Sequence, residues 1–163
     1  MRAAAKSGKR VIAAGPGNPP VVVDETADLD HAAKSIIAGA SFDNNLLCIG
    51  EKEVFVVEKV FDAFRAAMKR AGAVELDEAA IERLSDAAFK FDGPGKGCGR
   101  AHLKRDLVGK DVADLAAAAG VKVPAGTDLL FGETKADHAF VVEEQMMPFI
   151  PRSEEHTSEL QSH

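Results

Sequence analysis

The sequence contains neither tryptophan nor tyrosine, and only two of its 163 residues are cysteine. Two cysteines, Cys48 and Cys98, cannot form the dense disulfide scaffold of a small secreted domain, which indicates a reducing, cytoplasmic setting. No apolar run approaches the roughly 18–20 residues of a membrane-spanning helix, so no membrane association is expected. Lys and Arg number 20 against 26 Asp and Glu, a net charge of −6, without a basic cluster. This balance argues against nucleic acids and anionic membranes as partners.

The hydrophobic share of 46% is sufficient for one domain, or part of a larger one, with a sizeable core. Residues 152–163 (RSEEHTSELQSH) differ in composition and have no periodicity. They match a one-frame translation of a common sequencing adapter, so we expect an artefactual, disordered tail outside the fold; a natural polar tail is the alternative. The expected domain therefore spans residues 1–151, and the natural chain is expected to continue beyond Pro151.

Short apolar runs between turn-forming residues predict strands at 10–14, 20–23 and 54–57. Between the last two, a helix is predicted that Thr26 or Asp28 can cap and that ends at Gly39. A strand–helix–strand unit favours a parallel sheet and an α/β fold. Further helices are predicted at 60–72, 77–88 and 111–119, strands at 129–131 and 140–142, and a glycine-rich loop at 91–110.

Cys48 follows a polar loop and immediately precedes the predicted buried strand. In parallel α/β sheets, functional groups gather at such strand ends, and a thiolate there can act as a nucleophile. A free cysteine is also among the most often buried residue types, so Cys48 could fill the core, and position alone favours that role. A redox-sensing thiol is a third possibility, although Cys98 is distant in the sequence.

Cys98 lies in the glycine-rich segment 93–99 (GPGKGCG), which fits neither standard phosphate-binding template. Nearby basic side chains could attract an anion, but a solvated loop is the favoured interpretation. Cys98 and His102 could supply two metal ligands, yet no second pair is spaced to complete a zinc site. We therefore predict no metal. The acidic pairs at 51/53 and 143/144 are interpreted as solvated charges.

Three stretches together resemble the aldehyde dehydrogenase superfamily, specifically its CoA-acylating branch of ethanolamine and propanediol breakdown. They are residues 13–30 (AAGPGNPPVVVDETADLD), residues 39–48 (GASFDNNLLC) followed by 51–54 (EKEV), and residues 141–148 (VVEEQMMP). Their order and spacing both match, and the resemblance covers essentially all of residues 1–151. It implies a three-layer α/β fold with a largely parallel sheet, representing part of the catalytic domain.

The resemblance implies that Cys48 is the catalytic nucleophile, which reverses the preference for a core role. Its thiolate would attack a short-chain aldehyde, and NAD or NADP would accept the hydride, leaving a thioester for coenzyme A. The backbone N–H of Cys48 would be one oxyanion donor, and the other would come from a region that this chain lacks. Glu144 falls where the superfamily binds the nicotinamide ribose, although Met146 and Met147 differ from the Phe-Gly of hydrolytic members.

Ala13 stands where hydrolytic aldehyde dehydrogenases carry the glutamate that activates water. Its absence fits acyl transfer to coenzyme A rather than hydrolysis. Leu47 and Ala139 replace expected prolines and leave the local loop geometry open. The resemblance also implies a cytoplasmic homo-oligomer, with residence in a bacterial microcompartment left open, and little activity from this stretch alone. The alternatives are a hydrolytic aldehyde dehydrogenase and a non-catalytic binding or assembly module that retains the fold.

Overall fold

Five strands form a sheet in the computed structural model, which describes residues 6, 8–10, 17–92 and 101–155. Within these residues the strand order is β1-β2-β7-β6-β3, and every neighbouring pair is parallel. The strands are β1 (Pro20–Val23), β2 (Glu53–Val57), β3 (Val74–Glu75), β6 (Leu130–Glu133) and β7 (Phe149–Glu155). The predicted α/β fold with a largely parallel sheet is confirmed.

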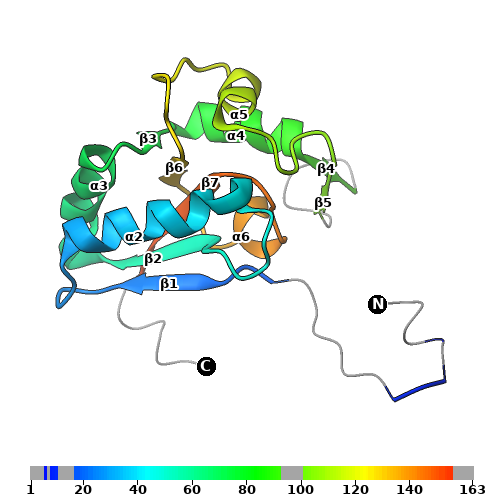
Figure 1. Cartoon of the computed structure of the whole chain (residues 1–163), viewed down its shortest axis with the longest axis horizontal. Helices are drawn as coiled ribbons and strands as arrows, with labels where there is room; N and C mark the ends of the chain where they lie inside the picture. Colours follow the sequence, from blue (N-terminus) through cyan, green and yellow to red (C-terminus); the bar gives the residue numbers. More distant parts are fainter. Residues whose placement is uncertain (1–5, 7, 11–16, 93–100, 156–163) are drawn as a thin grey trace.

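Helices cover both faces of this sheet, giving three layers (Figure 1). One face packs against α2 (Leu29–Ser41) and α3 (Phe61–Arg70), and the other against α4 (Glu78–Ala88), α5 (Val112–Ala119) and the short α6 (Ala139–Val142). Successive side chains of a strand point to opposite faces. Leu130 and Phe131 accordingly belong to different core clusters, which explains why the central strands are continuously apolar.

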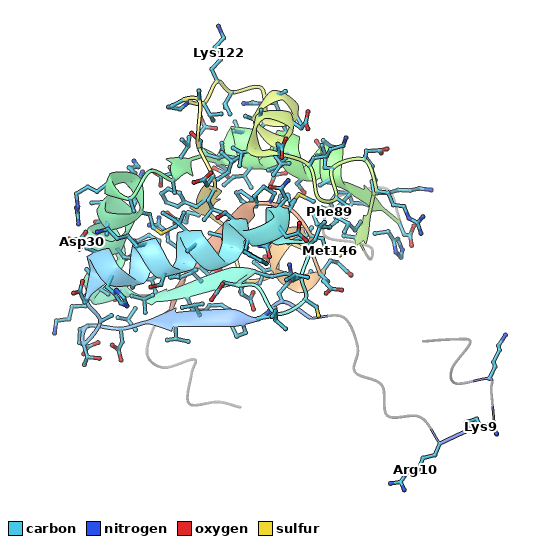
Figure 2. The ribbon with its side chains drawn as sticks, in the orientation of Figure 1. Lys9, Arg10, Asp30, Phe89, Lys122 and Met146 are labelled. Atoms are coloured by element: carbon cyan, nitrogen blue, oxygen red, sulfur yellow. The ribbon has the colours of Figure 1, made fainter. Side chains whose placement is uncertain are left out.

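The helix starts follow the sequence signals. The Asp28 carboxylate accepts a hydrogen bond from the His31 N–H at 3.0 Å, and Asp77 accepts from the Ala80 N–H at 2.8 Å. At the beginning of α2, Asp30 forms an ion pair with Arg70 of α3 at the position labelled in Figure 2. Gly120 ends α5 in the left-handed region, at φ 70°. The predicted helices at 28–39, 60–72, 77–88 and 111–119 are thus confirmed within one or two residues at most ends.

From its glycines we had predicted that the segment 91–110 is a loop. Part of it instead forms strands. β4 (Phe89–Phe91) pairs antiparallel with β5 (Ala101–Leu103). Phe89 and Ala101 are buried, so the hairpin has an apolar face that stabilises its pairing against α4. The intervening residues 93–100, Cys98 among them, lie outside the described part of the chain, as do residues 11–14 of the predicted first strand.

The strand predicted at 140–142 is wrong, because residues 139–142 form α6. A short apolar run does not distinguish a strand from a buried helical turn. The Phe140 ring lies between those of Phe89 and Phe149, with centroid distances of 5.0 and 4.6 Å. His138 caps the turn by accepting the Phe140 N–H. Packing of one aromatic ring therefore decided the local conformation.

Residues 152–155 continue β7 between β2 and β6, past the domain boundary expected at residue 151, and that boundary stays a prediction. Backbone pairing of these residues satisfies N–H and C=O groups whatever the side chains are. Residues 156–163 lie outside the described part of the chain. The adapter origin of this segment stays a prediction.

Arg152 is an unusual residue to find in this strand, since its side chain is only 1% exposed. None of its three guanidinium nitrogens has a hydrogen-bond partner among the described residues. The carboxylates of Glu75 and Glu133 lie 3.9 and 3.6 Å away, and the Phe61 ring lies 3.8 Å beneath the guanidinium. Burial lowers the pKa of Arg152, and the two carboxylates act in the opposite direction. A charge buried without hydrogen bonds is destabilising.

We therefore expect Arg152→Met to stabilise the chain by about 1–4 kcal/mol, because an apolar side chain of similar length removes the desolvation cost. Glu75 keeps Arg65 and Lys69 as partners in this variant. Urea unfolding followed by circular dichroism measures the change. Arg105→Met, at an exposed position, is the matched control. A lower urea midpoint for Arg152→Met than for the control would contradict the expectation.

Candidate functional site

Cys48 lies in an exposed loop between the 3-10 helix η1 (Phe42–Asn45) and β2, and its side chain is exposed. The interpretation of Cys48 as a core residue is therefore wrong. Large apolar side chains of the same stretch of sequence are also exposed: Phe42 is 64% exposed and Ile49 80%, and Leu46 and Leu47 are exposed too. A cluster of large exposed apolar side chains around one thiol is typical of a binding surface rather than of ordinary solvent-facing chain.

Before this loop, three consecutive residues adopt left-handed backbone conformations. The φ angles of Asp43, Asn44 and Asn45 are 49°, 51° and 59°. Asp and Asn tolerate this region better than other non-glycine residues, but each still costs roughly 1–2 kcal/mol. The Asn44 Nδ2 donates to the Gly109 carbonyl at 3.1 Å and to Asp111 Oδ1 at 2.8 Å, which anchors the turn to the α5 side. Such a run of strain, held by specific bonds, is typical of functional sites.

The base of the Cys48 loop is fastened by a buried lysine. Lys52 is fully buried, and its Nζ donates to the Asn45 carbonyl at 2.6 Å and to Asn45 Oδ1 at 2.7 Å. The Asn45 Nδ2 in turn donates to the Glu51 carbonyl at 2.9 Å. The loop of residues 46–50 is therefore closed at its base by hydrogen bonds between Asn45, which precedes it, and Glu51 and Lys52, which follow it.

A second set of bonds joins the regions around residues 18 and 141–149 to this base. The Asn18 Nδ2 donates to the carbonyls of Val141 and Glu143 at 2.8 and 2.9 Å. The buried Gln145 donates through Nε2 to the Lys52 carbonyl at 3.1 Å and the Phe149 carbonyl at 2.8 Å. Gly109 N–H donates to the carbonyl of Met146, labelled in Figure 2. Three stretches far apart in the sequence are thus brought together beneath Cys48.

Glu144 is half-buried and precedes Gln145, which donates to the Lys52 carbonyl. Burial lowers the pKa of Lys52, and the charges of Glu144 and Cys48 act in the opposite direction. Both predicted site residues therefore lie within electrostatic range of one buried ammonium. The carboxylate of Glu144 is a suitable acceptor for hydroxyl groups of a ligand, and the Cys48 thiol is accessible for covalent chemistry.

Four residues of this network were not singled out from the sequence: Asn18, Asn45, Lys52 and Gln145. Lys52 alone carried a usable signal. Alternation along β2 puts Lys52, Val54 and Val56 on one face, and this face is buried. The Asn18 and Gln145 side chains had no such pattern, because Asn18 donates to the Val141 carbonyl 123 positions away and Gln145 to the Lys52 carbonyl 93 positions away.

Glu53, at the first position of β2, has an unusual environment. Its Oε2 is buried and has no hydrogen-bond partner among the described residues. Burial raises the pKa of Glu53 from 4.5 to about 7. A raised carboxyl pKa in the folded state contributes stability that is fully present below the unfolded pKa and is lost as the pH rises through the folded pKa.

We therefore expect the free energy of unfolding to fall between about pH 4.5 and pH 7 and then to level off. Glu53→Gln should remove this part of the pH dependence, which is on the order of 1–2 kcal/mol after allowance for partial exposure. Urea titrations at about pH 5 and pH 8 measure it. Glu25→Gln, at an exposed position, serves as control. A Glu53→Gln variant with the full original pH dependence would rule out Glu53 as its source.

Other predicted features lie elsewhere. Ala13 and Cys98 are outside the described part of the chain. Within the described residues, no group of three or more His, Cys, Asp or Glu side chains is arranged to hold a metal ion, and none of the helices is long and apolar enough to cross a membrane. A cavity of about 1050 Å³ lies between α4, the end of β6 and α6, and neither Cys48 nor Glu144 lines it.

Comparisons with known proteins agree with the resemblance. Residues 1–79 match the model of the aldehyde dehydrogenase family. The chain is 52% identical over 144 residues to acetaldehyde dehydrogenase (acetylating) EutE of Salmonella typhimurium, covering 88% of this chain and 30% of that protein. It is 46% identical over 147 residues to propanal dehydrogenase (CoA-propanoylating) of Citrobacter freundii, covering 90% and 30%.

Among solved structures, propionaldehyde dehydrogenase of Rhodopseudomonas palustris with bound propionyl-CoA superposes with a TM-score of 0.83 at 38% identity, covering 97% of this chain and 33% of that one. The chain thus spans about a third of the length of the proteins it matches. The parallel three-layer fold, the exposed cysteine on its fixed loop and these similarities lead to one conclusion: the chain belongs to the aldehyde dehydrogenase family.

Proposed function

We propose that the enzyme containing this chain oxidises a short-chain aldehyde to an acyl-CoA, with NAD or NADP and coenzyme A as co-substrates. The observation that carries this proposal is the exposed Cys48, on a loop fixed by the network that joins the three motif-bearing parts of the chain. Relatives and structural neighbours support it. One structure of the R. palustris enzyme contains CoA and an acylated cysteine, and an engineered glycolyl-CoA reductase contains NADP+.

In the proposed mechanism, the Cys48 thiolate attacks the aldehyde carbonyl carbon and forms a hemithioacetal. The Cys48 backbone N–H donates to the negative oxygen that develops on that carbon. The exposed apolar side chains beside the thiol, Phe42 and Ile49 among them, favour a small apolar substituent over a charged one. Collapse of the hemithioacetal expels a hydride and leaves a thioester on Cys48.

Glu144 is the residue that would hold the nicotinamide ribose. Its half-buried carboxylate can accept hydrogen bonds, and its position is restrained because the next residue, Gln145, donates to the Lys52 carbonyl. Bound NAD or NADP supplies the hydride acceptor. The chain therefore contributes the nucleophile and one ribose contact, which fits a nicotinamide close to the thiol.

The thioester is resolved by coenzyme A in this proposal, rather than by water. Ala13 has no group that could deprotonate a water molecule, whereas a thiol is more acidic than water and needs less activation. This observation disfavours a hydrolytic aldehyde dehydrogenase. An intact, exposed cysteine also disfavours a non-catalytic assembly module. Homo-oligomerisation and a microcompartment setting are part of the proposal, the latter supported by a neighbour from a fucose-utilisation microcompartment.

A chimera tests the proposal. This chain replaces the matching 144 residues of the Salmonella relative, and the purified chimera is incubated with propanal or acetaldehyde, NAD or NADP, and CoA. Mass spectrometry should identify propionyl-CoA or acetyl-CoA as the product. The free carboxylic acid as the main product would show a hydrolytic enzyme instead.

A further inference from the structure

Burial of the Lys52 ammonium group carries a large desolvation penalty. An ammonium group removed from water is strongly destabilised unless it is well bonded. Lys52 is fully buried, and its Nζ bonds are to two oxygens of a single residue, Asn45. Neutral acceptors compensate a buried charge less well than a carboxylate would. An apolar residue would fill the same space at lower cost, so the presence of lysine calls for a role other than packing.

The two bonds from Lys52 reach the last residue of the left-handed turn. Asn45 adopts φ 59°, and the Lys52 Nζ binds both its carbonyl and its side-chain oxygen. The Asn45 side chain also leaves no space for a side chain at residue 50, because a Cβ added to Gly50 would lie 2.8 Å from Asn45 Oδ1. The ammonium therefore fixes backbone and side chain of Asn45 at once, and Asn45 closes the base of the 46–50 loop.

The ammonium of Lys52 also interacts electrostatically with both predicted site residues, Cys48 and Glu144. The Lys52 carbonyl accepts the Gln145 Nε2 at 3.1 Å, which fixes the segment next to Glu144. Movement of Lys52 would therefore disturb the placement of the thiol and of the carboxylate together.

We propose that Lys52 is a positioning residue, whose buried ammonium holds the Asp43–Asn45 turn and so sets the conformation of the loop that presents Cys48. Its relevance to catalysis rests on the proposed function, in which Cys48 is the nucleophile. The positioning itself is a property of this chain and is measurable without turnover.

The test uses the 163-residue chain and the variant Lys52→Met, which keeps the side-chain length and removes the charge and the donors. Lys34→Met makes the same chemical change at an exposed position of α2 and is the matched control. Amide hydrogen exchange is followed by mass spectrometry in residues 43–50 and in β6 and β7. Alkylation by iodoacetamide at one fixed pH is followed separately on the peptides that contain Cys48 and Cys98.

We expect exchange in residues 43–50 of Lys52→Met to rise by about tenfold, with β6 and β7 much less affected, because bonds to a charged group are lost locally. The alkylation rate of Cys48 at this pH should differ by about twofold or more from that of the control, because the loop that presents the thiol no longer keeps one conformation. The alkylation rate of Cys98 should stay unchanged. If Lys52 only fills space, neither the exchange in residues 43–50 nor the alkylation rate of Cys48 changes selectively.

A second variant covers the case in which Lys52→Met does not fold. Asn45→Gly removes the side-chain acceptor, and glycine adopts φ 59° without strain. It should raise exchange in residues 43–50 in the same direction. The proposal is overturned if exchange there stays within about twofold of the control, or rises equally in β6 and β7, or if the alkylation rate of Cys48 does not change. Such a result would not bear on the proposed function, because product formation by the chimera tests that function separately.

Discussion

Cys48→Ala should abolish acyl-CoA formation by the chimera described above, lowering kcat by several orders of magnitude. The methyl group of alanine cannot form the covalent bond to the aldehyde, and no other described residue at the site offers a replacement nucleophile. The effect should appear in kcat, with substrate binding largely retained. Steady-state NADH formation at 340 nm measures it, and intact-protein mass spectrometry should show loss of the acyl adduct.

Cys98→Ala is the control for this experiment, because it removes the other thiol of the chain. That variant should retain most of the activity. Near-normal turnover by Cys48→Ala would contradict the covalent mechanism through Cys48. If only Cys98→Ala lost activity, the nucleophile would be Cys98 and not Cys48.

Omission of coenzyme A should stop turnover after a single cycle. With aldehyde and NAD alone, each site should release at most one equivalent of NADH, since the acyl group stays on Cys48 when no acceptor is present. Addition of CoA should restore steady NADH formation. Rapid-mixing measurement of NADH separates the initial burst from the steady rate.

Ala13→Glu is the companion variant in this second experiment. It supplies a carboxylate at the position where the hydrolytic members have one, and a slow CoA-independent rate is the expected gain. A base without its supporting residues usually acts weakly. Steady NADH formation without CoA in the unmodified chimera would mean that water is the acyl acceptor, and the CoA-acylating assignment would then be wrong.

The sequence predicted much of the fold because its local signals and its tertiary environment agree. Asp28 and Asp77 cap the helices that follow them, as their positions indicated. The continuous apolar run at 54–57 became a central strand, because both faces of β2 lie inside the three-layer arrangement. Where signals conflicted, as at residues 140–142, the packing of the Phe140 ring edge-on to Phe89 and tilted against Phe149 favours the helical turn.

The sequence likewise predicted one part of the candidate site and left another part undetermined. The motif around Cys48 marked it as the candidate nucleophile, and residue order placed it just before a buried strand. Its exposure could not be deduced from sequence, because a lone cysteine fits a core as well as a surface. The tertiary structure decided this by a left-handed turn that lifts residues 46–50 away from the core.

By itself, then, the sequence determined the fold class, the helix starts, the family resemblance and the identity of the candidate nucleophile, since these depend on local pattern and motif spacing. Only the tertiary structure decided what surrounds the thiol. Asn18 bonds to carbonyls more than 120 positions away, and Lys52 and Gln145 join two segments separated by 93 positions. Such bonds run from side chains to backbone groups, which every residue carries, so no sequence pattern marks the partner.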